Sequence, residues 1–157
     1  MLKNVSEFIL DGYGSGETDF LTRVSQSSQQ VQDDLNLFII DPLLAVLAST
    51  DQTAVLEIQG HSDRVDTEGL SREERRVQEL QASADRANSA DVGVFQIVAF
   101  NVPDPKTFPG DWADLNQVVI MRRVAGGAFL INSSAALTEE QRKQNRRVVL
   151  TLASFLP

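Results

Sequence analysis

The sequence predicts a two-layer α/β sandwich, in which a mixed sheet carries its helices on one face. Short apolar segments of strand length alternate with longer segments whose apolar residues recur at helical spacing. Turns rich in glycine and proline separate them. With 157 residues, 42% of them hydrophobic, the chain can bury one core, so we expect a single domain over residues 1–157. The expected order of elements is β-α-β-α-β-(α)-β.

The first half of the chain is expected to hold two strands around a helical segment. Residues 5–10 are apolar enough for a strand, and the glycine-rich stretch 12–16 then forms a loop. Apolar residues within 18–48 recur at helical spacing. Asp41-Pro42 inside this segment suits an N-cap followed by proline, so either two helices or one kinked helix is expected. Residues 54–60 form the second strand, which ends at a glycine.

The second half is expected to alternate helices and strands again. Ser71-Arg72-Glu73-Glu74 has the capping-box pattern and should start a helix. Residues 94–100 fit either the last turns of that helix or a strand. The proline-rich stretch 101–114 is expected to be a surface loop. The remaining elements are a strand at 118–121, a short helix that Thr138 caps in the Thr-x-x-Gln pattern and that runs to Gln144, and a strand at 148–152.

Composition excludes several classes of protein. The net charge of −8 argues against a nucleic-acid surface, which needs a basic face. No apolar run is long enough for membrane insertion. The absence of cysteine excludes a disulfide and a lipid-modified cysteine. The N-terminus has no signal-peptide pattern. Two localisations stay open: synthesis in the cytoplasm with association in a particle, or the periplasm or cell envelope if a leader was removed.

The turn after residues 54–60 carries the strongest candidate for a functional residue. His61, Ser62 and Asp63 follow the strand directly, and loops at the ends of rigid strands often hold function. A turn aspartate that bonds its own backbone is the alternative for Asp63. His61 is the only histidine, so a zinc site is not expected, and three consecutive residues cannot act as a catalytic triad. We therefore expect no metal, no cofactor and no enzyme activity.

Three segments, in this order, resemble the signature of the OmpA-like peptidoglycan-binding domains, the family of the OmpA C-terminal domain and Pal. The turn Ile58-Gln59-Gly60-His61-Ser62-Asp63 is similar to the I-x-G-H-T/S-D motif. Ser83-Ala84-Asp85-Arg86-Ala87 is similar to the S-x-x-R-A helix start. Arg142-Lys143-Gln144-Asn145-Arg146-Arg147-Val148 is similar to the closing R-x-x-N-R-R-V. The motif-bearing core reaches from about residue 54 to residue 152, and the family has the two-layer fold expected above.

The resemblance implies non-catalytic binding of peptidoglycan through the diaminopimelate arm of the stem peptide. That arm ends in an ammonium and a carboxylate on one carbon. In the family pattern Asp63 would hold the ammonium and Arg86 the carboxylate, which arginine can bind bidentately. A solvated helix arginine is the alternative for Arg86. Residues bordering the site would be His61, Ser62, Asn145 and Arg146; for Asn145 a structural role is favoured, and Arg146 would add positive potential.

Three departures from the family pattern bear on this site. Asp63 and Arg86 lie farther apart than in the family, which places an insertion within residues 65–78. That insertion contains a near-match to the arginine motif, so Arg75 is a reserve for Arg86. Glu79 stands where the family often has asparagine, and a carboxylate there would repel a ligand carboxylate.

The alternative function is a structural or adaptor subunit of a phage-tail-like or contractile injection assembly that reuses the OmpA-like fold. The missing leader, the insertion and Glu79 motivate it. Its partners would be subunits of that larger assembly, in place of or in addition to peptidoglycan.

Overall fold

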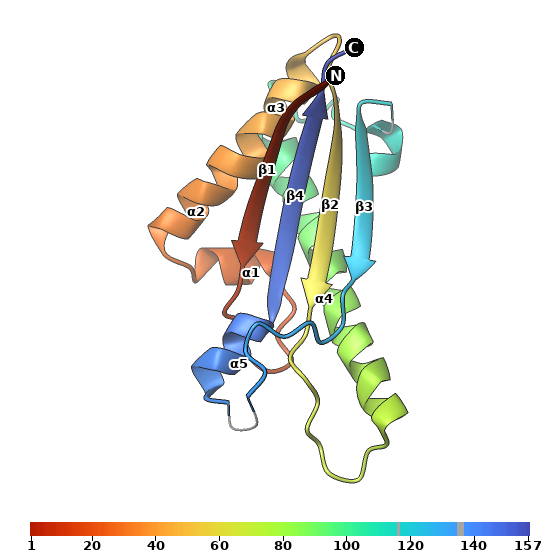
Figure 1. The fold of residues 1–157 in the computed structure, drawn as a ribbon. Coiled ribbons are helices and arrows are strands. Elements are labelled where there is room, and N and C mark those ends of the chain that lie inside the picture. Colours follow the sequence, from red (N-terminus) through yellow and green to blue (C-terminus); the bar gives the residue numbers. More distant parts are fainter. Residues whose placement is uncertain (116, 135–136) are drawn as a thin grey trace.

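The fold follows the predicted order of strands and helices (Figure 1). The structure is a computed structural model and describes residues 1–115, 117–134 and 137–157. The strands are β1 (Leu2–Leu10), β2 (Thr53–His61), β3 (Val119–Ala125) and β4 (Arg147–Phe155). They form one mixed sheet in the order β1-β4-β2-β3, in which β4 is antiparallel to both of its neighbours and β2 and β3 are parallel.

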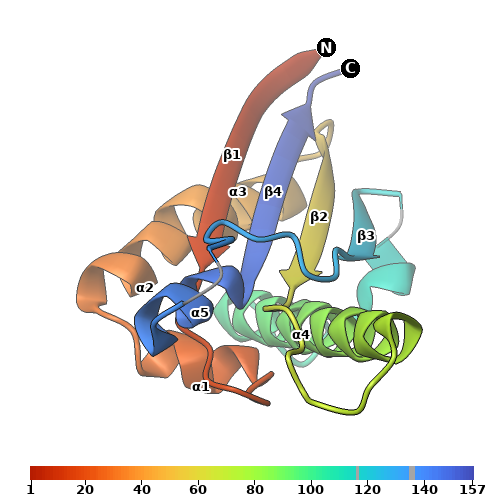
Figure 2. The ribbon, with the colours of Figure 1, turned by 60° about the horizontal axis from the view of Figure 1, so that its bottom comes forward.

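One face of the sheet is buried under the helices, as the two-layer prediction requires (Figure 2). Burial alternates along β2 and β4, so that Leu56 and Ile58 point inward with Leu150 and Leu152. Helix α4 (Arg72–Asn101) covers β2 and β3, and the earlier helical segment covers β1 and β4. The period of two along each strand therefore defines the core face. None of the described helices is long and apolar enough to cross a membrane.

The earlier helical segment consists of α1 (Phe20–Ser25), α2 (Gln29–Leu35), a π-helical turn (Asn36–Ile40) and α3 (Asp41–Ala48). The predicted N-cap at Asp41 is wrong, because Asp41 has helical backbone angles and the helix runs through it. Pro42 has no N–H to donate to the carbonyl of Phe38 one turn earlier. The Ser6 hydroxyl of β1 donates to that carbonyl instead. A wide turn and a bond from a distant strand thus accommodate the proline.

Both predicted capping boxes are present. Ser71 and Glu74 cap the start of α4, and Thr138 and Gln141 cap α5 (Glu139–Asn145). Helix α4 has 30 residues and includes residues 94–100, so the helical alternative for that stretch is correct. A 3-10 helix (Trp112–Leu115) lies near the end of the proline-rich stretch.

One end of the sheet gathers several segments that are distant in the sequence. The loop after β2, the first half of α4, and α5 meet at the end of the molecule opposite the two termini (Figure 1). The three motif-bearing segments of the sequence lie on these elements.

Candidate ligand-binding site

A cavity of about 520 Å³ lies at this end of the sheet, where β2 runs into the loop before α4. The loop 62–67, the first half of α4 and residues around α5 line it, together with Ser15 and Gly16. Charged groups of both signs dominate the lining: the carboxylates of Asp63, Asp66 and Glu79, and the guanidinium groups of Arg64, Arg86, Arg142 and Arg146.

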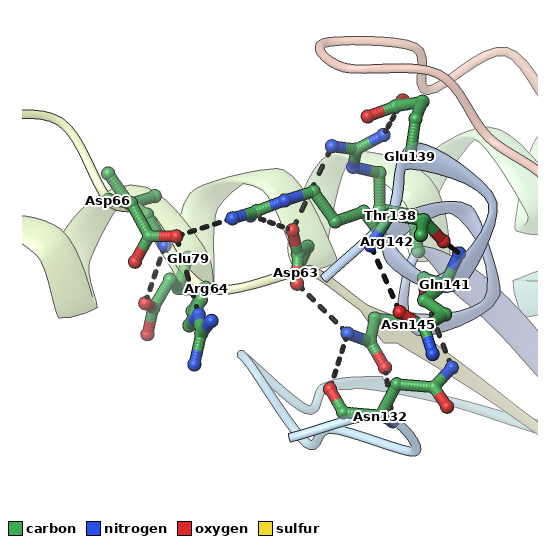
Figure 3. A network of polar contacts seen from close by, with 12 residues as sticks. Asp63, Arg64, Asp66, Glu79, Asn132, Thr138, Glu139, Gln141, Arg142 and Asn145 are labelled. Atoms are coloured by element: carbon green, nitrogen blue, oxygen red, sulfur yellow. Dashed lines mark hydrogen bonds and ion pairs between the residues drawn. The ribbon is translucent and has the colours of Figure 1, made fainter. Parts of the chain in front are cut away.

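Asp63 is fixed in this cavity by side chains from the closing motif (Figure 3). It is only 7% exposed. Its Oδ1 accepts a hydrogen bond from Asn145 Nδ2 at 2.9 Å, and its Oδ2 accepts one from Arg142 Nη1 at 2.7 Å. Arg146 Nη2 lies 3.8 Å from the same Oδ2. The partners of Asp63 thus come from α5 and the residue after it, which joins the turn after β2 to the closing motif.

Arg142 also belongs to the site, although the sequence predicted no role for it beyond its place in the closing motif. Its Nη2 binds Asp66 Oδ2 at 2.7 Å, so one guanidinium bridges Asp63 and Asp66. The hydrogen bond from Arg142 holds the pKa of Asp66 below its usual range. Arg142 is the first residue of the R-x-x-N-R-R-V segment and lies one helical turn before Asn145. This spacing places both side chains on one face of the helix, and it is the feature of the sequence that could have indicated Arg142 as a site residue.

Arg86 is buried, with 2% of its surface exposed, and points from α4 toward the end of β2. Its Nε donates to the carbonyl of Glu17 at 3.0 Å and its Nη1 to the carbonyl of His61 at 3.1 Å. The guanidinium carbon lies 5.3 Å from the centre of the Tyr13 ring. Burial lowers the pKa of Arg86 to about 10, so the side chain stays charged at neutral pH. Nη2 has no acceptor among the described residues, and Arg86 lines the cavity.

The structure thus places Asp63 and Arg86 on one cavity. The reserve residue Arg75 lies outside it and lines a neighbouring hollow with Arg72 and Arg76. Glu79 does line the cavity, and its Oε1 accepts a hydrogen bond from the backbone N–H of Val65 at 2.9 Å. Glu79 therefore secures the loop after β2, a role that the sequence did not suggest.

The other predicted site residues are divided between the cavity and the core beside it. Ser62 and Arg146 line the cavity, and Arg146 also donates to Glu139 at 2.8 Å. His61 and Asn145 are buried and do not line it. Asn145 Oδ1 accepts the backbone N–H groups of Ile131 and Asn132, both at 2.9 Å. Within the described residues, no cluster of histidine, cysteine and acidic side chains is placed to hold a metal ion.

His61 makes the stability of the domain depend on pH. Burial, with a smaller effect of the Arg147 charge, lowers the pKa of His61 from 6.5 to about 4. Between these values the unfolded chain binds the proton and the folded chain does not, so stability falls as the pH drops through this window. We expect the wild type to lose about 2 kcal/mol more than H61Q between pH 7 and pH 4.5, measured by urea unfolding. Equal losses in both proteins would contradict this.

The H61Q comparison isolates the histidine. The raised pKa of the buried Asp91 acts with the opposite sign, since that stability is lost as the pH rises. Asp66, whose pKa is lowered, titrates below this window. Both carboxylates are common to the two proteins, so their contributions cancel in the difference.

Comparison with known proteins finds no matching family model and no matching curated protein. Among solved structures, the chain is similar to the periplasmic domain of Helicobacter pylori MotB, with a TM-score of 0.44 and 17% identity over 97% of this chain and 86% of that one. It is also similar to the cell wall anchor of the T6SS from Pseudomonas aeruginosa, with a TM-score of 0.43 and 18% identity over 100% of this chain and 87% of that one.

Proposed function

We propose that this chain binds peptidoglycan, without catalysis, through the cavity that Asp63 and Arg86 share. The observation that carries the proposal is the Arg86 guanidinium, which is buried, charged and without an acceptor for Nη2 among the described residues. A buried charge is costly unless an opposite charge and hydrogen bonds compensate it. A ligand carboxylate in the cavity would supply both.

The opposite charges of the lining favour a zwitterionic ligand. Asp63, Asp66 and Glu79 can hold an ammonium group while Arg86 holds a carboxylate. The diaminopimelate arm of the peptidoglycan stem peptide carries both groups on one carbon, and the three motifs of the sequence support this ligand. Peptidoglycan that has lysine in place of diaminopimelate carries only the ammonium on this arm. The carboxylate therefore distinguishes the diaminopimelate type of cell wall from the lysine type.

Binding at Asp63 requires one rearrangement. Both carboxylate oxygens of Asp63 already accept hydrogen bonds, from Asn145 and Arg142. Arg142 is the more exposed partner, with 25% of its side chain accessible, whereas Asn145 is fully buried. The ammonium of the ligand therefore displaces or shares the Arg142 contact, and the released guanidinium keeps its bond to Asp66.

Pull-down on purified sacculi tests this proposal. We expect the wild type to bind sacculi of the diaminopimelate type and to bind sacculi of the lysine type at least tenfold more weakly, because the latter lack the carboxylate. R86Q removes a charge-assisted contact of about 1.5–3 kcal/mol, which is ten- to hundredfold in affinity. R76Q is the matched control, since Arg76 is an exposed arginine of the same helix and does not line the cavity.

Two results would contradict the proposal: equal retention of R86Q and wild type, or equal binding of the two wall types. Circular dichroism checks that R86Q is folded. If it is not, competition of free diaminopimelate against Nα-acetyl-lysine amide, whose only charged group is the side-chain ammonium, answers the same question on the wild type. Copurification with a large complex, without retention on sacculi, would instead support the adaptor function.

A further inference from the structure

A second cavity, of about 480 Å³, lies beside the other half of α4. It is formed between this helix, the 3-10 helix at Trp112–Leu115 and the edge strand β3. In the described part of the chain it shares no lining residue with the cavity at Asp63. The proposed peptidoglycan site therefore does not account for it.

A buried carboxylate lies in this cavity. Asp91 is 9% exposed, and burial raises its pKa above the usual range. Its ion pair is with Arg123, whose Nη1 lies 3.3 Å away and also donates to Asn88 Oδ1 at 2.9 Å. Half of the Arg123 side chain is exposed, and such a pair adds little stability. The burial of Asp91 is thus only partly compensated within the protein.

Aromatic side chains form the wall next to Asp91. The rings of Phe95 and Trp112 pack edge to face, with their centres 5.1 Å apart. Trp112 is 6% exposed, and its indole lies close enough to Asp91 to lower the pKa of this carboxyl, against the larger effect of burial. The carboxylate therefore lies directly beside the aromatic wall of the cavity.

The charge of the lining indicates the sign of the ligand. Asp91 and Asp111 carry two negative charges against the one positive charge of Arg123. Aromatic faces such as those of Phe95 and Trp112 also attract cations. A concave, largely apolar site with a few convergent polar groups is the usual form of a small-molecule site.

We propose that this cavity is a second ligand site, for a small organic cation that carries an aromatic or other apolar body. The ammonium binds the carboxylate of Asp91, and the apolar body packs against Phe95 and Trp112. Arg123 moves outward when the ammonium takes its place, since its side chain is half exposed.

Three probes that differ in one group test this site. Phenylethanolamine carries an ammonium, phenyl glycol has a hydroxyl in that position, and mandelate has a carboxylate. Trp112 is the only tryptophan, so its fluorescence reports binding at the cavity directly. We expect a saturable change with phenylethanolamine, at least tenfold weaker binding of phenyl glycol and no binding of mandelate.

Variants assign the charge preference to Asp91. D91N is expected to lower the affinity for phenylethanolamine at least tenfold and to leave the affinity for phenyl glycol unchanged. R123Q is expected to raise the affinity for phenylethanolamine, because it removes the guanidinium that competes with the ammonium for Asp91. E73Q is the control, because Glu73 is an exposed carboxylate of the same helix that does not line the cavity, and this variant should stay within twofold of wild type. Equal binding of phenylethanolamine and phenyl glycol, or no saturable change with millimolar probe, would overturn the proposal. If D91N does not fold, the three probes on the wild type decide the question.

Discussion

G60A is expected to lower the free energy of unfolding by about 3 kcal/mol, at the upper end of what overpacking a protein core costs. A Cβ atom on Gly60 would lie 1.8 Å from the carbonyl oxygen of Ser83 and 2.9 Å from the backbone nitrogen of Ala87. Both atoms belong to the backbone of α4, so no side-chain rotation can relieve the clash. The whole helix would have to move away from β2.

The strand cannot move in place of the helix. Gly60 pairs with Ala125 of β3 on one side and with Val148 of β4 on the other, so it lies in an inner strand of the sheet. The glycine is needed here for close approach of strand and helix, and it does not have a positive φ. This is a packing constraint of the kind that interior glycines in strands often satisfy.

Urea unfolding monitored by circular dichroism measures the effect. G110A is the matched control, because a Cβ atom at Gly110 would meet nothing within 4 Å and this glycine has no positive φ. Its free energy of unfolding should stay within about 1 kcal/mol of wild type. A G60A protein as stable as G110A would show that β2 and α4 are not packed as described.

The same displacement would disturb the candidate site. Arg86 lies directly before Ala87 on α4, and its Nη1 donates to the carbonyl of His61, the residue after Gly60. A helix pushed away from the strand breaks this bond. Residual folded G60A should therefore also bind sacculi more weakly than wild type.

The sequence predicted best those features that depend on local chemistry. Both capping boxes were correct, and the ends of β2 were correct to within one residue, because the responsible residues lie within a few positions of one another. The π-helical turn before Pro42 was not foreseen, since Ser6 supplies the bond to Phe38 from a distant strand. Local pattern alone cannot indicate such a bond.

The candidate site shows the same division. The proximity of Asp63 and Arg86 was expected from the resemblance, because nothing local brings the end of a strand to the middle of a helix. The role of Arg142 was missed because its two carboxylate partners lie on the loop after β2. The second cavity was missed for a similar reason: Asp91 lies on α4 and Trp112 on the 3-10 helix, so only the tertiary fold brings them to one cavity.

D63A is expected to lower the free energy of unfolding by about 3 kcal/mol, because removing one partner of a buried ion pair leaves the other charge less compensated. The side chain of Asp63 is 5% exposed, and that of Arg146, 3.8 Å away, is 9% exposed. Of its ion pairs among the described residues, Arg146 then keeps the one with Glu139, whose side chain is 55% exposed. Asn145 would also lose the acceptor of one hydrogen bond. Arg142 can turn toward solvent or Asp66, which keeps the loss near the lower end for buried pairs.

D66A is the matched control for D63A. Asp66 accepts a hydrogen bond from the same Arg142, at the same distance of 2.7 Å, but 48% of its side chain is exposed. Exposed pairs contribute up to about 1 kcal/mol and are screened by salt. D66A should therefore lose less than about 1 kcal/mol, and this loss should vanish in 1 M NaCl. The loss in D63A should persist in salt because Asp63 and two of its partners, Asn145 and Arg146, are buried. Urea unfolding of both variants at low and high salt separates the two cases, and equal losses would show that Asp63 is not the buried centre of this network.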